Sequence, residues 1–355
     1  MRNEIDSLLE RARDHGTPLV DDRSAIFVWE GDEAPELIGD FNQWGWQSPP
    51  TPLEQVASGL WAHTMPLPSD AYLEYSYRVG DGRVNDPFNP NLGPNGVGGF
   101  HNWFAMPDFA ETPLTEERSG PARGTVTPHE VECHGFAVGD RRRVHLYRPA
   151  TDYPCPLLLV FDGDQYLEHG RLVQIVDNLI AQERIRPINM ALVDAGDRAR
   201  FVEYCCSDAT LRFLERFILP LAHEHLNVIE DATVHGVLGA SMGGLMALYA
   251  ALRAPARFGL VLSQSGAFGF GPDAHFESVI YDVVRHASAR PAIWMDAGRY
   301  EGFVEMNCRM RDLLTERGYG VTYREYNGGH NYICWRNDVW RGIEALYGRR
   351  QHNAS

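Results

Sequence analysis

Short apolar runs alternate with helical patterns over the carboxyl-terminal part of the chain, from about residue 127 onward. The segments 172–180 and 211–226 carry apolar residues with the 3.6-residue period of helices that are packed on one side. Such alternation is typical of an α/β fold with a mostly parallel sheet and helices on both faces, in which functional groups gather at the carboxyl ends of the strands. The expected strands are 157–161, 190–193, 233–238, 260–263 and 292–295.

Residues 24–106 have a different pattern, which is typical of an all-β domain. Short aromatic or β-branched runs stand between turn-forming residues. In the run 72–79, strict alternation places Tyr75, Tyr77 and Val79 on one face of a strand. Several short strands separated by turns predict a β-sandwich.

These patterns divide the chain into four parts. Residues 1–23 are expected to form a helical extension, and residues 24–106 the sandwich. The segment 107–126 contains Pro, Gly and Glu and few apolar residues, which predicts a linker. The α/β domain then covers residues 127–350.

Composition adds little to this picture but excludes several partners. A chain of 355 residues is long enough for two domains, and a formal net charge of −16 argues against nucleic acid or an anionic membrane as a partner. No apolar run reaches transmembrane length and the amino terminus does not resemble a signal peptide, so we expect a cytoplasmic location. The six cysteines lack the spacing of a zinc site, and we expect no metal.

The candidate nucleophile is Ser241, which lies in the sequence Gly239-Ala240-Ser241-Met242-Gly243. A strand-like run precedes this motif, and an apolar helical run, 244–252, follows it. A strand, a sharp turn and a helix are what a nucleophile elbow requires, because the turn lifts the serine hydroxyl out of the sheet. The amide of Met242 would lie at the start of the helix, where it can stabilise a developing oxyanion.

A serine nucleophile needs a base, and the candidate base is His330. It follows the strand-like run 321–325 in a loop that contains two glycines. His275 and His286 also follow Ser241 but lie in a stretch between strands without such a loop. The pattern therefore favours His330.

The carboxylate that orients the base is expected near the end of the strand that begins at residue 292. Glu301 lies in the loop beyond this strand, whereas Asp296 lies within its end. A loop carboxylate reaches a histidine more easily, which favours Glu301 over Asp296, with Asp338 as a third choice.

A second oxyanion donor is expected from the loop after the strand 157–161. Gly163 lets the backbone turn there, so the donor is the amide of Gly163 or of Asp164. An arginine near the pocket, Arg200, could meet an anionic ester, but the sequence favours a structural pair of Arg200 with Glu203. The candidate substrate-binding residues are Arg200, Phe268 and Tyr166.

Four segments of the α/β part resemble the family of enterochelin esterases, esterase D and feruloyl esterases. They are Phe161-Asp162-Gly163, the motif 239–244, Ser263-Gln264-Ser265-Gly266 and the run 323–330. The resemblance implies an α/β-hydrolase fold, Ser241 as the nucleophile and His330 as the base. It maps the acid of the family to the loop that holds Glu301.

The amino-terminal part resembles the early-set immunoglobulin-like domain found before glycogen-branching enzymes and as a glycogen-binding module. The matching segments are 37–44, 59–61, 74–77 and 85–90. Some relatives bind α-glucans through exposed tryptophans, which would give Trp44, Trp46 and Trp103 a role in sugar stacking. The sequence favours the simpler interpretation that these side chains pack the sandwich and its interface with the next domain.

Together these observations predict a serine carboxylic-ester hydrolase that acts on a small-molecule ester. The resemblance to enterochelin esterases makes a siderophore ester of that type one candidate substrate, and the sequence leaves the identity of the ester open. The reaction needs neither a metal nor an organic cofactor. An acyltransferase or a carbohydrate (feruloyl or acetyl) esterase of the same fold is an alternative, and a glucan-binding protein with a degenerate hydrolase domain is the non-enzymatic one. A homo-oligomer is compatible with the sequence.

Overall fold

The computed structural model describes residues 2–94, 99–117, 123–135, 139–196, 199–269 and 275–349. The chain divides into two compact units. The first, here called the sandwich unit, comprises Met1–Glu111, Gly298–Gly302 and Tyr326–His330. The second, the α/β unit, comprises Thr112–Ala297, Phe303–Glu325 and Asn331–Ser355. Two short late segments of the chain therefore belong to the unit that is built mainly from its beginning.

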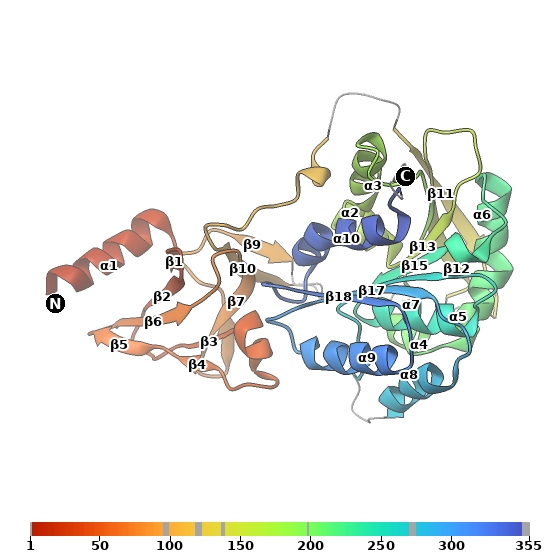
Figure 1. Cartoon of the computed structure of the whole chain (residues 1–355). Coiled ribbons are helices and arrows are strands. Elements are labelled where there is room, and N and C mark those ends of the chain that lie inside the picture. Colours follow the sequence, from red (N-terminus) through yellow and green to blue (C-terminus); the bar gives the residue numbers. More distant parts are fainter. Residues whose placement is uncertain are drawn as a thin grey trace, which may run out of the picture. The chain divides into compact units, whose positions relative to one another are not determined.

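The sandwich unit contains two antiparallel sheets and one long helix, α1 (Arg2–His15) (Figure 1). One sheet has the order β1-β2-β6-β5, and the other has the order β4-β3-β7-β10-β9, with β8 paired to β7. A 3₁₀ segment, η1, follows β3. The strands are β1 (Leu19–Val20), β2 (Ser24–Glu30), β3 (Glu36–Gly39), β4 (Thr51–Pro52), β5 (Glu54–Ala57), β6 (Leu60–Pro66), β7 (Tyr72–Val79), β8 (Gly82–Val84), β9 (Leu92–Pro94) and β10 (Phe100–Ala105), and η1 is Asp40–Gly45.

Aromatic side chains fill the space between these sheets. Tyr75 and Tyr77 are fully buried, as the alternation in their strand predicts, and Phe27 packs edge-on against Tyr75 with ring centroids 5.1 Å apart. The hydroxyl of Tyr75 donates to Asp86 Oδ2 at 2.7 Å and accepts from Asn89 Nδ2 at 3.0 Å. The core is thus apolar around one buried polar network.

The α/β unit is built on one eight-stranded sheet in the order β11-β12-β14-β13-β15-β16-β17-β18. The ladders from β14 through β13, β15 and β16 to β17 are parallel, whereas β12 is antiparallel to both of its neighbours. This order confirms the expected α/β-hydrolase arrangement. The strands are β11 (Thr125–Glu132), β12 (Arg141–Arg148), β13 (Leu157–Phe161), β14 (Asn189–Val193), β15 (Gly236–Ala240), β16 (Leu260–Gln264), β17 (Ala292–Gly298) and β18 (Val321–Tyr326).

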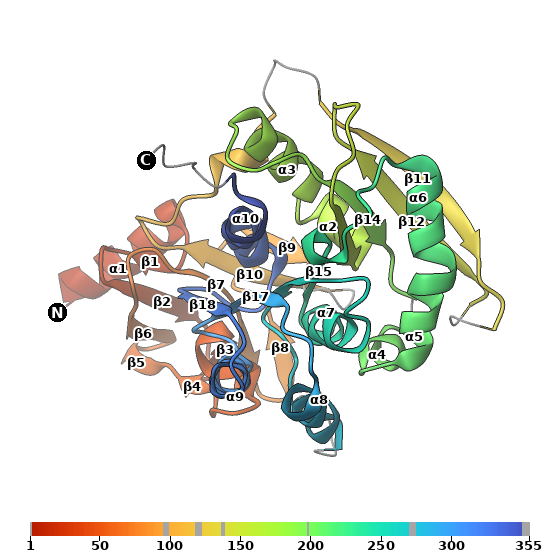
Figure 2. The same cartoon turned by 45° about the vertical axis from the view of Figure 1, so that its right-hand side comes forward.

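Helices cover both faces of this sheet (Figure 2). Helices α3 and α10 pack together on one face, and α7 packs with α4 and α8 on the other. Strands β13 to β16 are consequently buried along their whole length. The helical segments are η2 (Pro113–Thr115), α2 (Gly163–Glu168), α3 (Leu172–Ala181), α4 (Arg200–Tyr204), α5 (Asp208–Phe213), the π-helical η4 (Leu214–Ile218), α6 (Leu219–His225), η5 (Ala232–Val234), α7 (Met242–Arg253), α8 (His275–His286), α9 (Val304–Glu316) and α10 (Tyr332–Tyr347).

The structure differs from the expected elements at a few boundaries. The strand expected at 233–238 begins only at Gly236, because η5 occupies the residues before it. Within the segment expected as a linker, Leu114 and Thr115 are buried in η2, and residues 118–122 lie outside the described residues. Helices long and apolar enough to cross a membrane do not occur in the described part of the chain.

The buried network of Tyr75 yields the first prediction. Tyr75→Phe removes one donor to Asp86, a buried carboxyl group, and should lower the free energy of unfolding by about 1–3 kcal/mol in urea titrations. Tyr153→Phe, at an exposed tyrosine, is the matched control and should change it by less than about 0.5 kcal/mol. Equal stability of the two variants would contradict a stabilising role for this hydrogen bond.

Candidate active site

Ser241 lies in the tight turn between β15 and α7, in a backbone conformation that is rare for a residue with a side chain. Its φ and ψ angles are 57° and −121°, and α7 begins at the next residue, Met242. The turn depends on glycine, since a Cβ at Gly239 would lie 2.4 Å from the carbonyl carbon of Gly243. This strand, sharp turn and helix have the geometry of a nucleophile elbow, which presents the serine hydroxyl above the sheet.

The loop after β16 fixes the elbow through its backbone. The N–H of Ser241 donates to Gln264 O at 2.8 Å, and the N–H of Ala267 donates to Ser241 O at 3.0 Å. The side chain of Asn307, fully buried in α9, holds this loop by two hydrogen bonds to the backbone of Gly266, at 2.9 and 3.1 Å. Both backbone groups of Ser241 are therefore hydrogen-bonded, which fixes the conformation of the turn.

The loop after β13 begins α2 with a second tight turn. Asp162 has a positive φ of 54°, and Gly163 is the first residue of the helix. A Cβ at Gly163 would lie 2.4 Å from the backbone of Leu192, so a larger residue does not fit. The amide of Asp164 is directed at the carboxyl group of Asp194. Burial raises the pKa of this carboxyl group to about 6.

The carboxylate of Asp162 forms a bidentate ion pair with Arg200 of α4. Arg200 Nε and Nη2 donate to the two oxygens of Asp162, each at 2.7 Å. Burial disfavours the charged guanidinium, but the hydrogen bonds and charge of Asp162 outweigh this effect and raise the pKa of Arg200 above its ordinary value. Arg200 Nη2 also lies 3.5 Å from the carbonyl oxygen of Ala240, the residue directly before Ser241.

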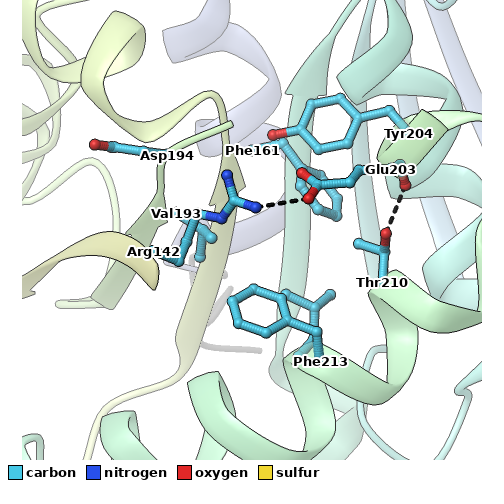
Figure 3. A pocket seen from close by; sticks show the side chains of 9 residues that line it. Arg142, Phe161, Val193, Asp194, Glu203, Tyr204, Thr210 and Phe213 are labelled. Atoms are coloured by element: carbon cyan, nitrogen blue, oxygen red, sulfur yellow. Dashed lines mark hydrogen bonds and ion pairs between the residues drawn. The ribbon is translucent and has the colours of Figure 1, made fainter. Parts of the chain in front are cut away.

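The pairing of Arg200 with Glu203 that the sequence allowed is corrected by the structure. Glu203 binds Arg142 of β12 instead, with 2.6 Å between Glu203 Oε1 and Arg142 Nη2 (Figure 3). Thr210 Oγ1 donates to the carbonyl oxygen of Glu203 at 2.7 Å beside the same small cavity. This buried pair attaches α4 to the sheet, and α4 in turn carries Arg200.

Two of the three candidate substrate-binding side chains are part of the core. Tyr166 is fully buried and donates its hydroxyl to Gln264 Oε1 at 3.0 Å, and Phe268 is 1% exposed within the apolar cluster of the α/β unit. Their side chains offer no surface to a ligand, because close-packed neighbours cover them. Of the three, only Arg200 reaches solvent, with 34% of its side chain exposed.

In the sandwich unit, His330 and Glu301 form a hydrogen-bonded pair. His330 Nδ1 lies 2.6 Å from Glu301 Oε2, and the N–H of Gly298 donates to Glu301 Oε1 at 3.1 Å. Glu301 is 3% exposed. A carboxylate at Nδ1 fixes the tautomer in which Nδ1 carries the proton, so Nε2 is the nitrogen that can accept one.

The other acid candidates are engaged elsewhere. Asp296 is fully buried in β17, where Gln264 Nε2 and Trp294 Nε1 donate to it, each at 3.2 Å. Asp338 accepts from two arginines on the α/β unit, Arg324 and Arg341. Among the histidine alternatives, His286 is exposed at the end of α8, and the side chain of His275 lies outside the described residues.

The three tryptophans considered for sugar stacking have different environments. Trp44 stacks on His101 with ring centroids 4.0 Å apart and donates from Nε1 to Asp40 Oδ1 at 3.0 Å. Trp103 stacks on Tyr72, whereas Trp46 is 78% exposed. Within the described residues no group of three or more His, Cys, Asp and Glu side chains is arranged to hold a metal ion.

Comparison with known proteins places the chain in a class of hydrolases. Residues 136–345 match the family described as putative esterases. The chain is 33% identical to the iron(III) enterobactin esterase of Dickeya dadantii over 228 residues, which are 59% of this chain and 52% of that protein. It is 26% identical to the iron(III) enterobactin esterase of Escherichia coli K12 over 280 residues, 77% of this chain and 69% of that protein.

Solved structures extend the likeness to both units. The ferric enterobactin esterase of Salmonella typhimurium superposes with a TM-score of 0.74 at 21% identity, covering 91% of this chain and 93% of that one. The enterobactin esterase of Shigella flexneri, solved in the presence of enterobactin, gives 0.74 at 22% identity over 92% and 94%.

The chain therefore belongs to the esterase family and, within it, resembles the enterobactin esterases. The match spans about half the length of the Dickeya relative.

The ion pair of Arg200 and Asp162 yields the second prediction. Arg200→Met leaves a buried carboxylate without its partner and should lower the free energy of unfolding by about 2 kcal/mol, less than for a fully buried pair because Arg200 reaches solvent. Adding Asp162→Asn should recover part of this loss in a double-mutant cycle. Arg253→Met, which breaks the exposed ion pair of Arg253 with Asp208, is the control. Purely additive effects of the substitutions at Arg200 and Asp162 on the free energy of unfolding would contradict an energetic coupling between these two residues.

Proposed function

We propose that this chain is a serine esterase that hydrolyses an ester of an enterobactin-like catecholate siderophore. The observation that carries the proposal is the elbow at Ser241, with its positive φ at the start of α7. Such strain in a non-glycine residue is retained where it serves a function. Membership of the esterase family supplies the reaction class.

In the proposed reaction the hydroxyl of Ser241 attacks the ester carbonyl carbon while His330 Nε2 takes the hydroxyl proton. The carbonyl oxygen becomes an oxyanion, which the amides of Met242 and Gly163 stabilise. When the C–O bond of the ester breaks, His330 returns its proton to the leaving alkoxide. Water then attacks the acyl-enzyme by the same steps, which releases the acid and restores Ser241.

Chain order and local contacts support these assignments. Nucleophile, acid and base occur in the order expected for this fold, Ser241, Glu301 and His330. Glu301 holds the imidazole by the 2.6 Å contact, whereas Asp296 is engaged with core side chains. Gly163 is preferred to Asp164 as the second donor, because the Asp164 amide is directed at Asp194.

The proposed substrate class comes from the relatives. Two of them are iron(III) enterobactin esterases, and a third, from Escherichia coli, is an iron(III) salmochelin esterase. A Shigella structure was solved in the presence of 2,3-dihydroxy-N-benzoyl-serine. Arg200 of α4, whose Nη2 lies 3.5 Å from the carbonyl oxygen of Ala240 in the elbow, is the candidate to meet an anionic catecholate.

The third prediction concerns the nucleophile. Ser241→Ala should lower kcat by about 10⁴-fold or more on enterobactin, with and without iron, and on p-nitrophenyl acetate and butyrate, with the circular dichroism spectrum unchanged. Ser58→Ala, at an exposed serine of the sandwich, is the control and should retain full activity. Undiminished turnover by Ser241→Ala would contradict the assignment.

The same panel separates the alternatives. Preference for methyl ferulate over enterobactin would favour a carbohydrate esterase, and a product that forms only with an added alcohol or sugar would favour an acyltransferase. Retention on glycogen without any hydrolysis would favour the binding protein.

The fourth prediction ranks the two acids. Glu301→Gln should lower kcat by about 10²–10⁴-fold, because the imidazole loses the group that sets its tautomer. Asp296→Asn should affect mainly stability, since Asp296 contacts core side chains. Steady-state kinetics and urea unfolding of both variants test this ranking, and the reverse order of kcat values would move the acid to Asp296.

A further inference from the structure

Two acidic side chains of the sandwich, Asp40 and Glu74, lie beside the loop that carries His330 (Tyr326–His330, here called the histidine loop) and have no part in the proposed triad. Asp40 begins η1, and Glu74 is within β7. Asp40 is 3% exposed and the side chain of Glu74 13% exposed. Buried carboxyl groups are costly unless they have partners, so the groups around these two side chains decide whether they are charged.

The histidine loop takes the place of β3 at one edge of β7. β3 pairs with β7 as far as Gly39, which lies opposite Tyr75, and β10 occupies the other edge. Beyond Gly39 the N–H of Tyr72 donates to the carbonyl oxygen of Asn327 at 3.1 Å. The loop thus continues the sandwich sheet from the point where β3 ends.

The register of this contact brings Glu74 to His330. Tyr72 forms a parallel bridge with Gly328. In parallel chains, residues two positions further along each chain are again neighbours, and these are Glu74 and His330. Burial raises the pKa of Glu74 to about 7, and the charge of His330 acts in the opposite direction.

The carboxyl group of Asp40 packs against the same loop at Gly329. A Cβ at Gly329 would lie 2.0 Å from Asp40 Oδ2, so glycine alone leaves room for the carboxyl group. Asp40 Oδ2 also accepts from the N–H of Glu74 at 2.8 Å, and Oδ1 accepts from Trp44 Nε1 at 3.0 Å. The carboxyl group of Asp40, the first residue of η1, therefore contacts both β7 and the histidine loop.

The charges around Glu74 make His330 its cationic partner. His101 Nδ1 lies 3.7 Å from Glu74 Oε2, but burial and the charge of Arg83 lower the pKa of His101 to about 4, so this ring is neutral near pH 7. Arg83 itself is directed at His101 Nε2, 3.2 Å away. The other titratable or charged groups beside Glu74 and the histidine loop include Glu301, Arg299 and Asp70. Asp40 also lies there, and burial together with the charge of Glu74 raises the pKa of its carboxyl group well above the ordinary value.

We propose that Glu74 is a positioning residue of the esterase: beside Asp40, which packs against the histidine loop at Gly329, Glu74 places a second carboxylate next to His330 that stabilises its protonated form. This inference rests on the proposed function, in which His330 takes the serine proton. Because the carboxyl group of Glu74 ionises near pH 7, it stabilises protonated His330 above about pH 7, and this stabilisation is lost at lower pH.

The fifth prediction concerns the electrostatic coupling between Glu74 and His330. Because each charge shifts the pKa of the other group by the same amount, the coupling can be measured on either residue. In the Ser241→Ala chain, Glu74→Gln should move the midpoint of the His330 imidazole titration to lower pH by about one unit in NMR spectra. His330→Gln should move the carboxyl ¹³C titration of Glu74 to higher pH. Glu36→Gln, at the partly exposed partner of Arg78 on β3, is the control and should move neither.

Kinetics provide a second readout with Ser241 intact. Glu74→Gln should lower kcat about tenfold at pH 8 with KM within about twofold, and Glu74→Asp should restore part of the loss, because a carboxylate that acts on the base affects chemistry more than binding. A merely structural role would leave the pH profile unchanged.

The outcomes separate the two proposals. Serine-dependent hydrolysis together with uncoupled titrations of Glu74 and His330 would overturn this inference alone. No hydrolysis by the intact chain would contradict the proposed function, whatever the titrations show. If Glu74→Gln does not fold, the titration of Glu74 in His330→Gln decides by itself.

Discussion

The strained backbone conformation of Ser241 is the constraint that the packing around the turn between β15 and α7 has to satisfy. A non-glycine residue at φ 57° and ψ −121° costs about 1–3 kcal/mol, and it persists only when its surroundings leave no alternative. The buried strand β15 and the buried helix α7 fix the two ends of the turn, and hydrogen bonds to Gln264 and from Ala267 fix its middle. Packing on both sides of the turn therefore offsets the strain that presents the hydroxyl.

Features that are local in sequence could be predicted. The apolar runs of the parallel strands, the glycines of the elbow and the alternation in β7 each reflect the environment of consecutive residues, so the fold class followed from them. The choice of Glu301 used chain order and the reach of a loop, and the structure brings Glu301 to His330. Boundaries such as that of β15 were less accurate, because η5 has no distinct apolar pattern.

Features that join distant parts of the chain could not be predicted. The sequence suggested a pair of Arg200 with its near neighbour Glu203, but the arginine binds Asp162, which is 38 positions away in sequence. Tyr166 and Phe268 follow strand ends, and sequence alone does not show that the core covers them. For Asp40 the only sequence signal was its place in a segment that resembles a sugar-binding module, where Trp44 binds Asp40 through its indole N–H.

The pairing of the histidine loop with β7 also affects how the protein is made. Asn327 and Asp70 are hydrogen-bonded across 257 positions of sequence, so the sandwich unit includes residues that are synthesised long after its first strands. Domains fold largely as units during synthesis, yet this sheet has an open edge at Tyr72 until residue 330 has left the ribosome. The nascent chain therefore carries an unpaired strand edge, a feature that favours pairing with other chains, for most of its synthesis.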